Sequence, residues 1–129
     1  MAMRILIVED EQIIAADLAG RLAQMGHEVV GIASEGQEAV DLARQVKPEL
    51  VLMDVKLEGE MTGTEAARTI QEQTGAGIVF VTAFPNVLLR QPPQLSNPGI
   101  CLGKPFSRIQ LEAALNAAFH HRSTGETSH

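Results

Sequence analysis

Short apolar runs along the chain alternate with longer stretches in which apolar residues recur at helical spacing. A short apolar run is typical of a strand that is covered on both faces, as in a parallel sheet. Helical spacing of apolar residues is typical of a helix that packs one side against such a sheet. The pattern predicts strands over residues 4–8, 27–33, 50–54, 78–81 and 99–102 and helices over residues 13–25, 34–46, 62–73, 85–90 and 107–119.

Capping patterns mark three of the predicted helix starts. Ser34, Thr62 and Ser107 are each followed three residues later by Gln or Glu, which is the spacing of a capping box. Gly26 follows the first helix and tolerates the left-handed conformation of a helix stop. The apolar sides of the first and last helices are predicted to include Ile13 and Ile109.

Prolines set the fourth predicted helix apart from the others. Four of the six prolines lie in the segment from residue 85 to residue 98, namely Pro85, Pro92, Pro93 and Pro98. A proline inside a helix removes a hydrogen-bond donor and clashes with the preceding turn. The sequence therefore predicts at most a short helix, which begins at Pro85 and ends near Arg90.

Five alternations of strand and helix predict a doubly wound α/β fold with a five-stranded parallel sheet and helices on both faces. The length of 129 residues is that of one domain, which we assign to residues 1–122. The polar residues 123–129 are predicted to form a flexible tail.

Composition and charge exclude several classes of function. The chain carries 16 acidic and 10 basic residues and has no basic stripe, which argues against direct binding of nucleic acid through phosphate contacts. No apolar run reaches membrane-spanning length or resembles a signal peptide. A single cysteine excludes an internal disulfide and a cysteine-based zinc cluster. We therefore expect a cytoplasmic protein that does not contact the membrane.

Polar residues follow the predicted strands at their carboxyl ends. They are Glu9 and Asp10, Asp54, Thr82, and Lys104. Because the carboxyl ends of parallel strands meet at one edge of the sheet, we expect these side chains to converge there. Asp54 directly follows the four apolar residues 50–53, and we predict that it is the working residue, at the mouth of a crevice with its charge facing solvent.

This set of side chains fits phosphoryl transfer. Crowded carboxylates raise one another's pKa, and Mg²⁺ relieves such crowding by binding carboxylate and phosphate oxygens. An ionised Asp is a nucleophile in aspartyl-phosphate chemistry, and a lysine and a hydroxyl can hold the transferred oxygens. Each residue also has a plainer interpretation, since Asp54 could cap a loop and Lys104 could be a surface lysine. Their joint placement favours a shared site.

The chain resembles the receiver domain of bacterial two-component response regulators from residue 5 to about residue 119. The matching pieces are ILIVEDE at 5–11, LVLMD at 50–54, the loop with Gly59 and Gly63, VTA at 81–83, and GKPF at 103–106. The resemblance implies that Asp54 is the phosphoacceptor and that Mg²⁺ is held by Glu9, Asp10, Asp54 and the backbone carbonyl of Lys56. It also implies that Thr82 is the switch hydroxyl and Lys104 the phosphate-binding lysine.

The resemblance implies a stand-alone signalling switch rather than a classical enzyme. The phosphoryl donor would be a sensor histidine kinase or a phosphotransfer protein, and phosphorylation would change the affinity for a downstream protein. Lys56 and Phe84 would flank the path of the attacking water. Because neither can orient that water and both obstruct it, we expect slow self-dephosphorylation.

Two features depart from the family pattern. Cys101 occupies the position of the usual aromatic switch residue, and the segment from 85 to 98 replaces most of the usual fourth helix. Residues 81–89 look similar to receivers that are attached to a sigma-factor-like domain in general-stress regulators. The departures leave open a receiver-like binding module that works without phosphorylation. A phosphoester hydrolase is disfavoured, because Lys56 stands where a general-acid Asp would be needed.

Overall fold

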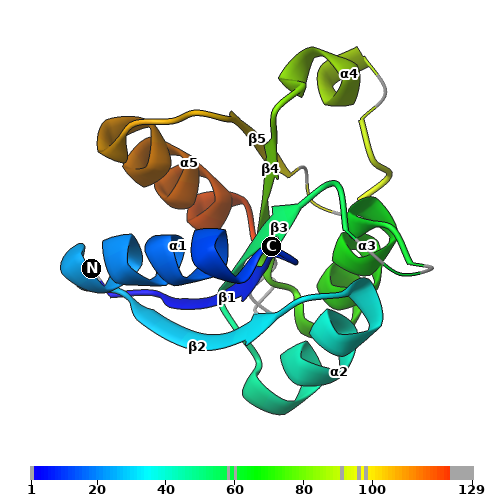
Figure 1. The fold of residues 1–129 in the computed structure, drawn as a ribbon. Helices are drawn as coiled ribbons and strands as arrows, with labels where there is room; N and C mark the ends of the chain where they lie inside the picture. The colour runs from blue at the N-terminus through cyan, green and yellow to red at the C-terminus, as the bar shows by residue number, and fades with distance from the viewer. Residues whose placement is uncertain are drawn as a thin grey trace.

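The computed structural model describes residues 2–57, 59, 61–90, 92–95, 97 and 99–122. Five parallel strands form one sheet in the order β2-β1-β3-β4-β5, as Figure 1 shows. The strands are β1 (Arg4–Val8), β2 (Glu28–Ala33), β3 (Leu50–Asp54), β4 (Gly77–Thr82) and β5 (Ile100–Gly103). The helices are α1 (Gln12–Gln24), α2 (Gly36–Val46), α3 (Gly63–Thr74), α4 (Pro85–Arg90) and α5 (Arg108–His121). The predicted fold class is confirmed.

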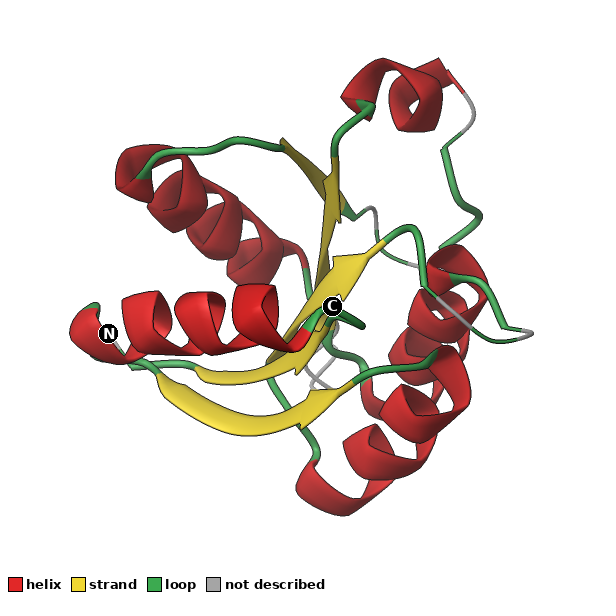
Figure 2. Ribbon diagram, in the orientation of Figure 1, coloured by secondary structure: helices red, strands yellow, loops and turns green. Residues whose placement is uncertain are grey.

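Helices cover both faces of the sheet, with α1 and α5 on one face and α2 and α3 on the other (Figure 2). Alternate residues of β1 and β3 divide between the two apolar cores, as the pleat of a strand requires. Ile5 and Leu52 pack on the α1 and α5 side, whereas Leu6 and Met53 pack on the α2 and α3 side. β3 and β4 are buried along their whole length, which fixes their carboxyl ends firmly at one edge.

Two of the three predicted capping boxes are present. Thr62 and Ser107 each accept a hydrogen bond from the backbone three residues later, and both reciprocal bonds form. The prediction for Ser34 is wrong, because α2 begins one residue later, with Glu35 at its N-cap. The backbone N–H and hydroxyl of Ser34 instead donate to the Glu38 carboxylate at 2.7 and 3.0 Å.

The prediction that Ile13 and Ile109 contribute to apolar helix sides is also wrong, because both side chains are exposed. Each residue lies in the first turn of its helix. The buried residues of α1 are Ala15, Leu18 and Leu22, and those of α5 are Leu111, Ala114, Leu115 and Ala118. With about 3.6 residues per turn, Ile13 and Ile109 lie on the sides of these helices opposite to the buried residues.

The short fourth helix is confirmed at the predicted bounds, Pro85–Arg90. It stands away from the sheet (Figure 1), buries none of its residues, and leaves Val87 and Leu89 exposed. Leu88 and Leu95 are the described side chains of this region that pack against the α2 and α3 side of the core. Pro98 and the predicted flexible tail lie outside the described residues. Within the described residues, no helix combines the length and apolar character needed to span a membrane.

Candidate functional site

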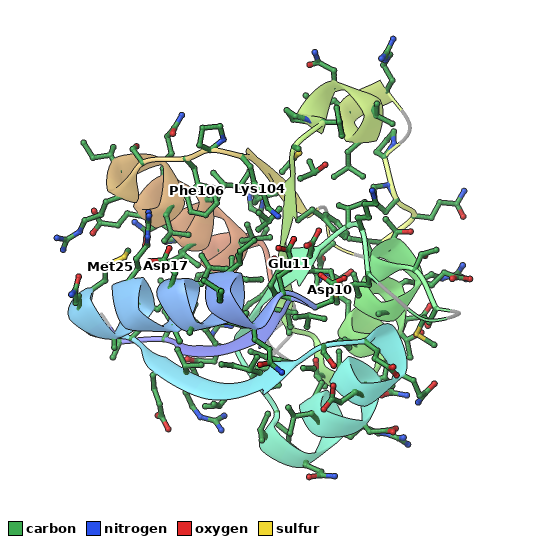
Figure 3. The ribbon with its side chains drawn as sticks, viewed as in Figure 1. Asp10, Glu11, Asp17, Met25, Lys104 and Phe106 are labelled. Carbon is green, nitrogen blue, oxygen red and sulfur yellow. The ribbon has the colours of Figure 1, made fainter. Side chains whose placement is uncertain are left out.

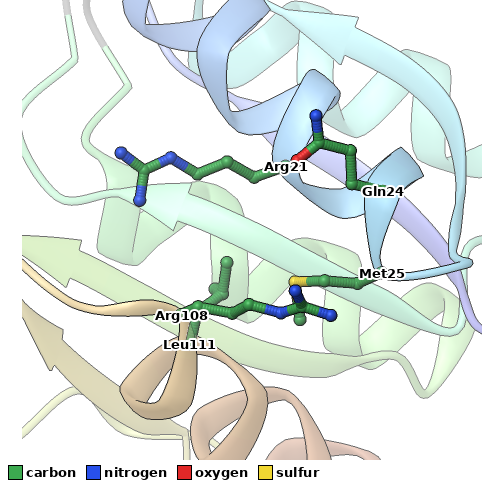
Figure 4. Close-up of a pocket in the computed structure, with 5 residues that line it drawn as sticks. All are labelled: Arg21, Gln24, Met25, Arg108 and Leu111. Carbon is green, nitrogen blue, oxygen red and sulfur yellow. The ribbon is translucent and has the colours of Figure 1, made fainter.

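The polar residues predicted from the strand ends do converge at the carboxyl edge of the sheet. Glu9 and Asp10 follow β1, Asp54 ends β3, Thr82 ends β4, and Lys104 follows β5. Figure 3 shows Asp10 and Lys104 at this same edge. A cleft of about 310 Å³ opens there, lined by Asp10, Glu11, Asp54, Lys56, Leu57, Thr82, Ala83, Phe84 and Lys104.

Three carboxylates form the centre of the site. Glu9, Asp10 and Asp54 each offer an oxygen, and these oxygens all lie within 4.8 Å of one another. Glu9 is only 3% exposed and Asp54 only 8% exposed. The expectation that the charge of Asp54 faces solvent is therefore wrong, although the residue still lines the cleft. Its position near the middle of the strand order, with β3 between β1 and β4, surrounds it with protein.

Backbone N–H groups orient two of these carboxylates. The N–H of Glu11 donates to Glu9 Oε2 at 3.1 Å, and the N–H of Lys56 donates to Asp54 Oδ1 at 3.0 Å. Each bond occupies one oxygen, and the other oxygen, Glu9 Oε1 or Asp54 Oδ2, lies 3.7 or 3.5 Å from Lys104 Nζ. The role of Glu11 was not predicted from the sequence, because it uses only the backbone. Lys56 lies at the cleft as predicted, and its carbonyl as a metal ligand stays a prediction.

Gly63 is a further residue that the site needs. It is the first residue of α3 and lies directly under the backbone of Asp54 and Val55. A Cβ at position 63 would collide with the carbonyl oxygen of Asp54. The glycine therefore allows α3 to begin against the end of β3, whereas the sequence pattern identifies it only as part of a family loop.

Lys104 provides the positive charge of the cleft. Its Nζ lies 3.5 Å from Asp54 Oδ2 and 3.7 Å from Glu9 Oε1. The backbone N–H of Lys104 donates to the carbonyl of Thr82 at 2.8 Å, which continues the pairing of β5 with β4 past Gly103. The Lys104 ammonium thus lies beside two of the three clustered carboxylates, and the cluster keeps an excess of negative charge.

The surroundings of Glu9 change its titration. Burial, and to a smaller extent the neighbouring Asp54, together raise the pKa of Glu9 from its ordinary value of 4.5 to about 7, against the lowering effect of the Glu11 N–H. The folded protein then binds a proton at Glu9 that the unfolded chain has already lost. Consequently, this group lowers the free energy of unfolding of the metal-free protein as pH rises from about 4.5 to about 7.

A divalent metal ion fits this set of ligands. Carboxylate oxygens are the ligands that Mg²⁺ prefers, and one or two carboxylates usually suffice because the ion keeps several waters. Glu9, Asp10 and Asp54 bring three carboxylate oxygens within 4.8 Å of one another, and the Asp54 charge is one of the causes that raise the pKa of Glu9. A cation between these oxygens would supply positive charge.

Thr82 and Phe84 connect the site to α4. Thr82 is buried, and its Oγ1 accepts a hydrogen bond from the backbone N–H of Phe84 at 3.0 Å. The ring of Phe84 lies at the wall of the cleft and is 71% exposed. The Thr82 hydroxyl at the cleft is therefore hydrogen-bonded to Phe84, the residue that precedes α4.

Cys101 lies in β5 and is partly buried. Burial raises the pKa of its thiol, which keeps the thiol in its protonated, less reactive form. The residue that occupies the position of the usual aromatic is thus a small packing group.

Comparison with known proteins agrees with the geometry. The response regulator receiver domain family matches residues 5–116. The transcriptional regulatory protein PdtaR of Mycobacterium tuberculosis is 44% identical over 115 residues, which are 89% of this chain and 56% of PdtaR. The phyllosphere-induced regulator PhyR of Methylorubrum extorquens is 34% identical over 119 residues, which are 92% of this chain and 44% of PhyR. The chain thus spans about half the length of these relatives.

Solved structures show the same fold. The anti-anti-sigma factor PhyR of Bartonella quintana is 34% identical with a TM-score of 0.82, over 93% of this chain and 48% of that one. The receiver domain of PhyR from Erythrobacter litoralis is 27% identical with a TM-score of 0.83, over 98% and 97% of the two chains. The receiver domain of the Pseudomonas aeruginosa sensor histidine kinase PA1611, which holds a magnesium ion in its active-site cleft, is 25% identical with a TM-score of 0.77, over 93% and 99%. The chain therefore belongs to the response regulator receiver domain family.

Proposed function

We propose that the chain, over residues 1–122, is a cytoplasmic phosphorylation switch whose Asp54 accepts a phosphoryl group in a Mg²⁺-dependent reaction. The donor is a phosphohistidine of a sensor histidine kinase or phosphotransfer protein. The observation that supports this most strongly is the placement of Lys104 Nζ 3.5 Å from Asp54 Oδ2, beside carboxylate oxygens that lie within 4.8 Å of one another.

The residues of the site take different parts in this reaction, and Asp54 takes two. A carboxylate oxygen of Asp54 forms the new bond to phosphorus while the bond from phosphorus to the donor nitrogen breaks. Lys104 and the hydroxyl of Thr82 contact the transferred oxygens. Glu9, Asp10, Asp54 and the carbonyl of Lys56 would hold Mg²⁺, which supplies positive charge to those oxygens when it is bound.

Incubation with Mg²⁺ and acetyl phosphate, followed by intact mass measurement, tests this function. The switch predicts the gain of one phosphoryl group, persistent after the donor is removed and absent when the metal is chelated. A binding module that works without phosphorylation predicts no gain in mass. A phosphoester hydrolase predicts steady release of phosphate with no stable adduct. Either of the last two results would contradict the proposal.

Binding of Mg²⁺ should depend on pH and on Asp10. Because the pKa of Glu9 is raised to about 7, a proton must leave Glu9 before its carboxylate is available, so affinity should rise as pH passes upward through about 7. Asp10→Ala should remove most of the binding at any pH. Calorimetric titration at about pH 6 and about pH 8 measures both effects.

The matched control for this titration is Asp41→Ala. Asp41 is an exposed acid of α2 that pairs with Arg44, away from the cleft. The Asp41→Ala variant should bind Mg²⁺ with the same affinity as the unchanged protein. Equal affinity of the Asp10 variant and the unchanged protein, or binding that does not strengthen with pH, would disprove the metal site.

Self-dephosphorylation should be slow and should become several-fold faster in Phe84→Ala. The ring lies at the cleft wall, and we propose that, with Lys56, it obstructs the approach of water to the phosphorus. Decay of the phosphoryl adduct after removal of the donor measures the rate. Val87→Ala, which shortens an exposed apolar side chain of the same helix but does not line the cleft, is the control. Equal decay rates in the two variants would exclude this role of Phe84.

The output of the switch is a change in affinity for a downstream protein. When Thr82 contacts a phosphoryl group, its hydrogen bond with the Phe84 N–H is disturbed, and the disturbance reaches α4 directly. No residue of α4 is fully buried, and Leu88 is only partly buried against the core, so α4 can move at a small cost in packing. The name of the Bartonella quintana relative, an anti-anti-sigma factor, supports a protein as the downstream partner. Comparison of amide chemical shifts with and without a phosphate mimic should show larger changes from residue 84 to 95 than in α2.

A further inference from the structure

Gln71 is a buried polar side chain that the site does not use directly. It lies on α3 and is only 4% exposed. Its Oε1 accepts a hydrogen bond from the backbone N–H of Asn97 at 2.9 Å, and its Nε2 donates to the backbone carbonyl of Asn97 at 3.0 Å. The same Nε2 lies 3.4 Å from the carbonyl of Ala76. One side-chain amide thus pairs with Asn97 in the way that a neighbouring peptide group would.

The two backbone partners of Gln71 precede neighbouring strands. Ala76 is the residue before β4, and Asn97 lies three residues before β5. The other ends of the same two strands carry Thr82 and Lys104 into the cleft. Gln71 therefore ties β4 and β5 together at the end of the sheet that lies opposite the site.

The register of β5 on β4 needs such support. β5 is an edge strand of four residues, of which Leu102 alone is fully buried. The preceding segment includes α4, in which no residue is fully buried and Leu88 is partly buried against the core. A short strand with few buried side chains specifies its register weakly, and a slip of one residue displaces it by about 3.3 Å and turns each side chain to the other face. Such a slip would take Lys104 away from Asp54.

We propose that Gln71 is a positioning residue that fixes the register of β5 on β4 and thereby holds Lys104 beside Asp54. This inference extends the proposed function, since it explains how a receiver with a six-residue α4 keeps its lysine in place. Gln71 acts at a distance and touches none of the reacting groups. Its loss should impair the lysine side of the site and spare the metal side, where Glu9 and Asp10 follow β1.

The chemistry of the side chain provides a sharp test. The pairing with Asn97 needs one donor and one acceptor on the same group. Leu at position 71 offers neither. An ionised Glu offers only acceptors, whereas a protonated Glu offers both and can restore the pair. At about pH 5.5, where burial keeps the new carboxyl group protonated, Gln71→Glu should behave like the unchanged protein. At about pH 8, where the group is ionised, Gln71→Glu should behave like Gln71→Leu.

Three measurements on Gln71→Leu and Gln71→Glu are compared with those on the unchanged protein at the same pH. In Gln71→Leu, the rate of adduct formation from acetyl phosphate should fall at least about tenfold, while Mg²⁺ affinity should not fall. Hydrogen exchange at the Asn97 amide should accelerate. NMR contacts between the paired residues Val79 and Ile100, and between Thr82 and Gly103, should weaken or shift by one residue.

Gln73→Leu and Gln73→Glu are the matched controls, because Gln73 is an exposed glutamine of the same helix. Neither should change any of the three measurements. If Gln71→Leu does not fold, the comparison of Gln71→Glu at the two pH values decides the question.

The inference would be overturned if Gln71→Leu forms the adduct at a rate within twofold of that of the unchanged protein and keeps the NMR contacts that define the register. The inference would also be overturned if the rate of adduct formation depends on pH in the same way in Gln71→Glu and in Gln73→Glu. If the unchanged protein forms no adduct, the proposed function fails, and the exchange and register measurements still decide the role of Gln71.

Discussion

Asp54→Asn should form no phosphoryl adduct, keep the receiver fold, and be more stable than the unchanged protein at about pH 8. The amide lacks the nucleophilic oxygen of an ionised carboxylate, so it cannot form the acyl phosphate. It can still accept the hydrogen bond from the Lys56 N–H that now reaches Asp54 Oδ1. Removal of the Asp54 charge also removes one of the causes that raise the pKa of Glu9.

The gain in stability should be on the order of 1 kcal/mol, because a shift of one pKa unit corresponds to about that free energy. Urea unfolding of the metal-free protein at about pH 8 measures it, and intact mass measures the adduct. Asp41→Asn, on the exposed side of α2, is the control and should keep both adduct and stability. An adduct that persists in Asp54→Asn would place the acceptor elsewhere, and a loss of stability would contradict the repulsion among the carboxylates.

Lys104→Met should slow adduct formation by about 10²-fold, the usual cost of removing one group that stabilises developing negative charge. Met keeps much of the length of the lysine side chain and removes its charge. The same variant should bind Mg²⁺ more tightly, because Lys104 competes with the ion for Asp54 and Glu9, from which it lies 3.5 and 3.7 Å. The two effects have opposite signs, which general damage to the site would not produce.

Lys47→Met is the control, because Lys47 is an exposed lysine at the end of α2. It should change neither quantity. A Lys104 variant in which adduct formation and Mg²⁺ affinity fall together would indicate that the lysine supports the fold of the cleft rather than the transferred phosphoryl group.

The sequence allows the site to be predicted because parallel topology leaves little freedom. Once four apolar runs are identified as strands of one parallel sheet, the residues that follow them must meet at one edge. Glu9, Asp54, Thr82 and Lys104 meet there in the structure. The short α4 was predictable for a similarly local reason, since prolines restrict a helix wherever they occur.

The errors concern features that depend on tertiary contacts. The burial of Asp54 results from neighbouring strands and from the close approach of Gly63, neither of which has a local signature at residue 54. The Ser34 pattern matches a capping box, yet the helix begins one residue later. The backbone N–H of Ser34 instead donates a hydrogen bond to the carboxylate of Glu38. Ile13 lies close to the apolar spacing of α1, but it is on the side of the helix opposite to Ala15, Leu18 and Leu22.

Gln71 shows the same limit in another form. Gln71 stands beside Glu72 and is followed by Gln73, and a polar side chain in such a stretch gives no sign in the sequence that it is buried. Its partner Asn97 lies 26 residues away in the proline-rich segment. Nothing in the local pattern connects the two, so their pairing becomes visible only when the chain is folded.

The central claim, that Asp54 is the phosphoacceptor, is tested most directly by chemical trapping of the adduct. Borohydride reduces an acyl phosphate to the alcohol with loss of phosphate, so a phosphorylated aspartate becomes homoserine, and peptide mass spectrometry locates it. After incubation with Mg²⁺ and acetyl phosphate, we expect homoserine at position 54 alone, and none when the metal is chelated. Homoserine at another aspartate, or none at position 54 under phosphorylating conditions, would contradict the claim.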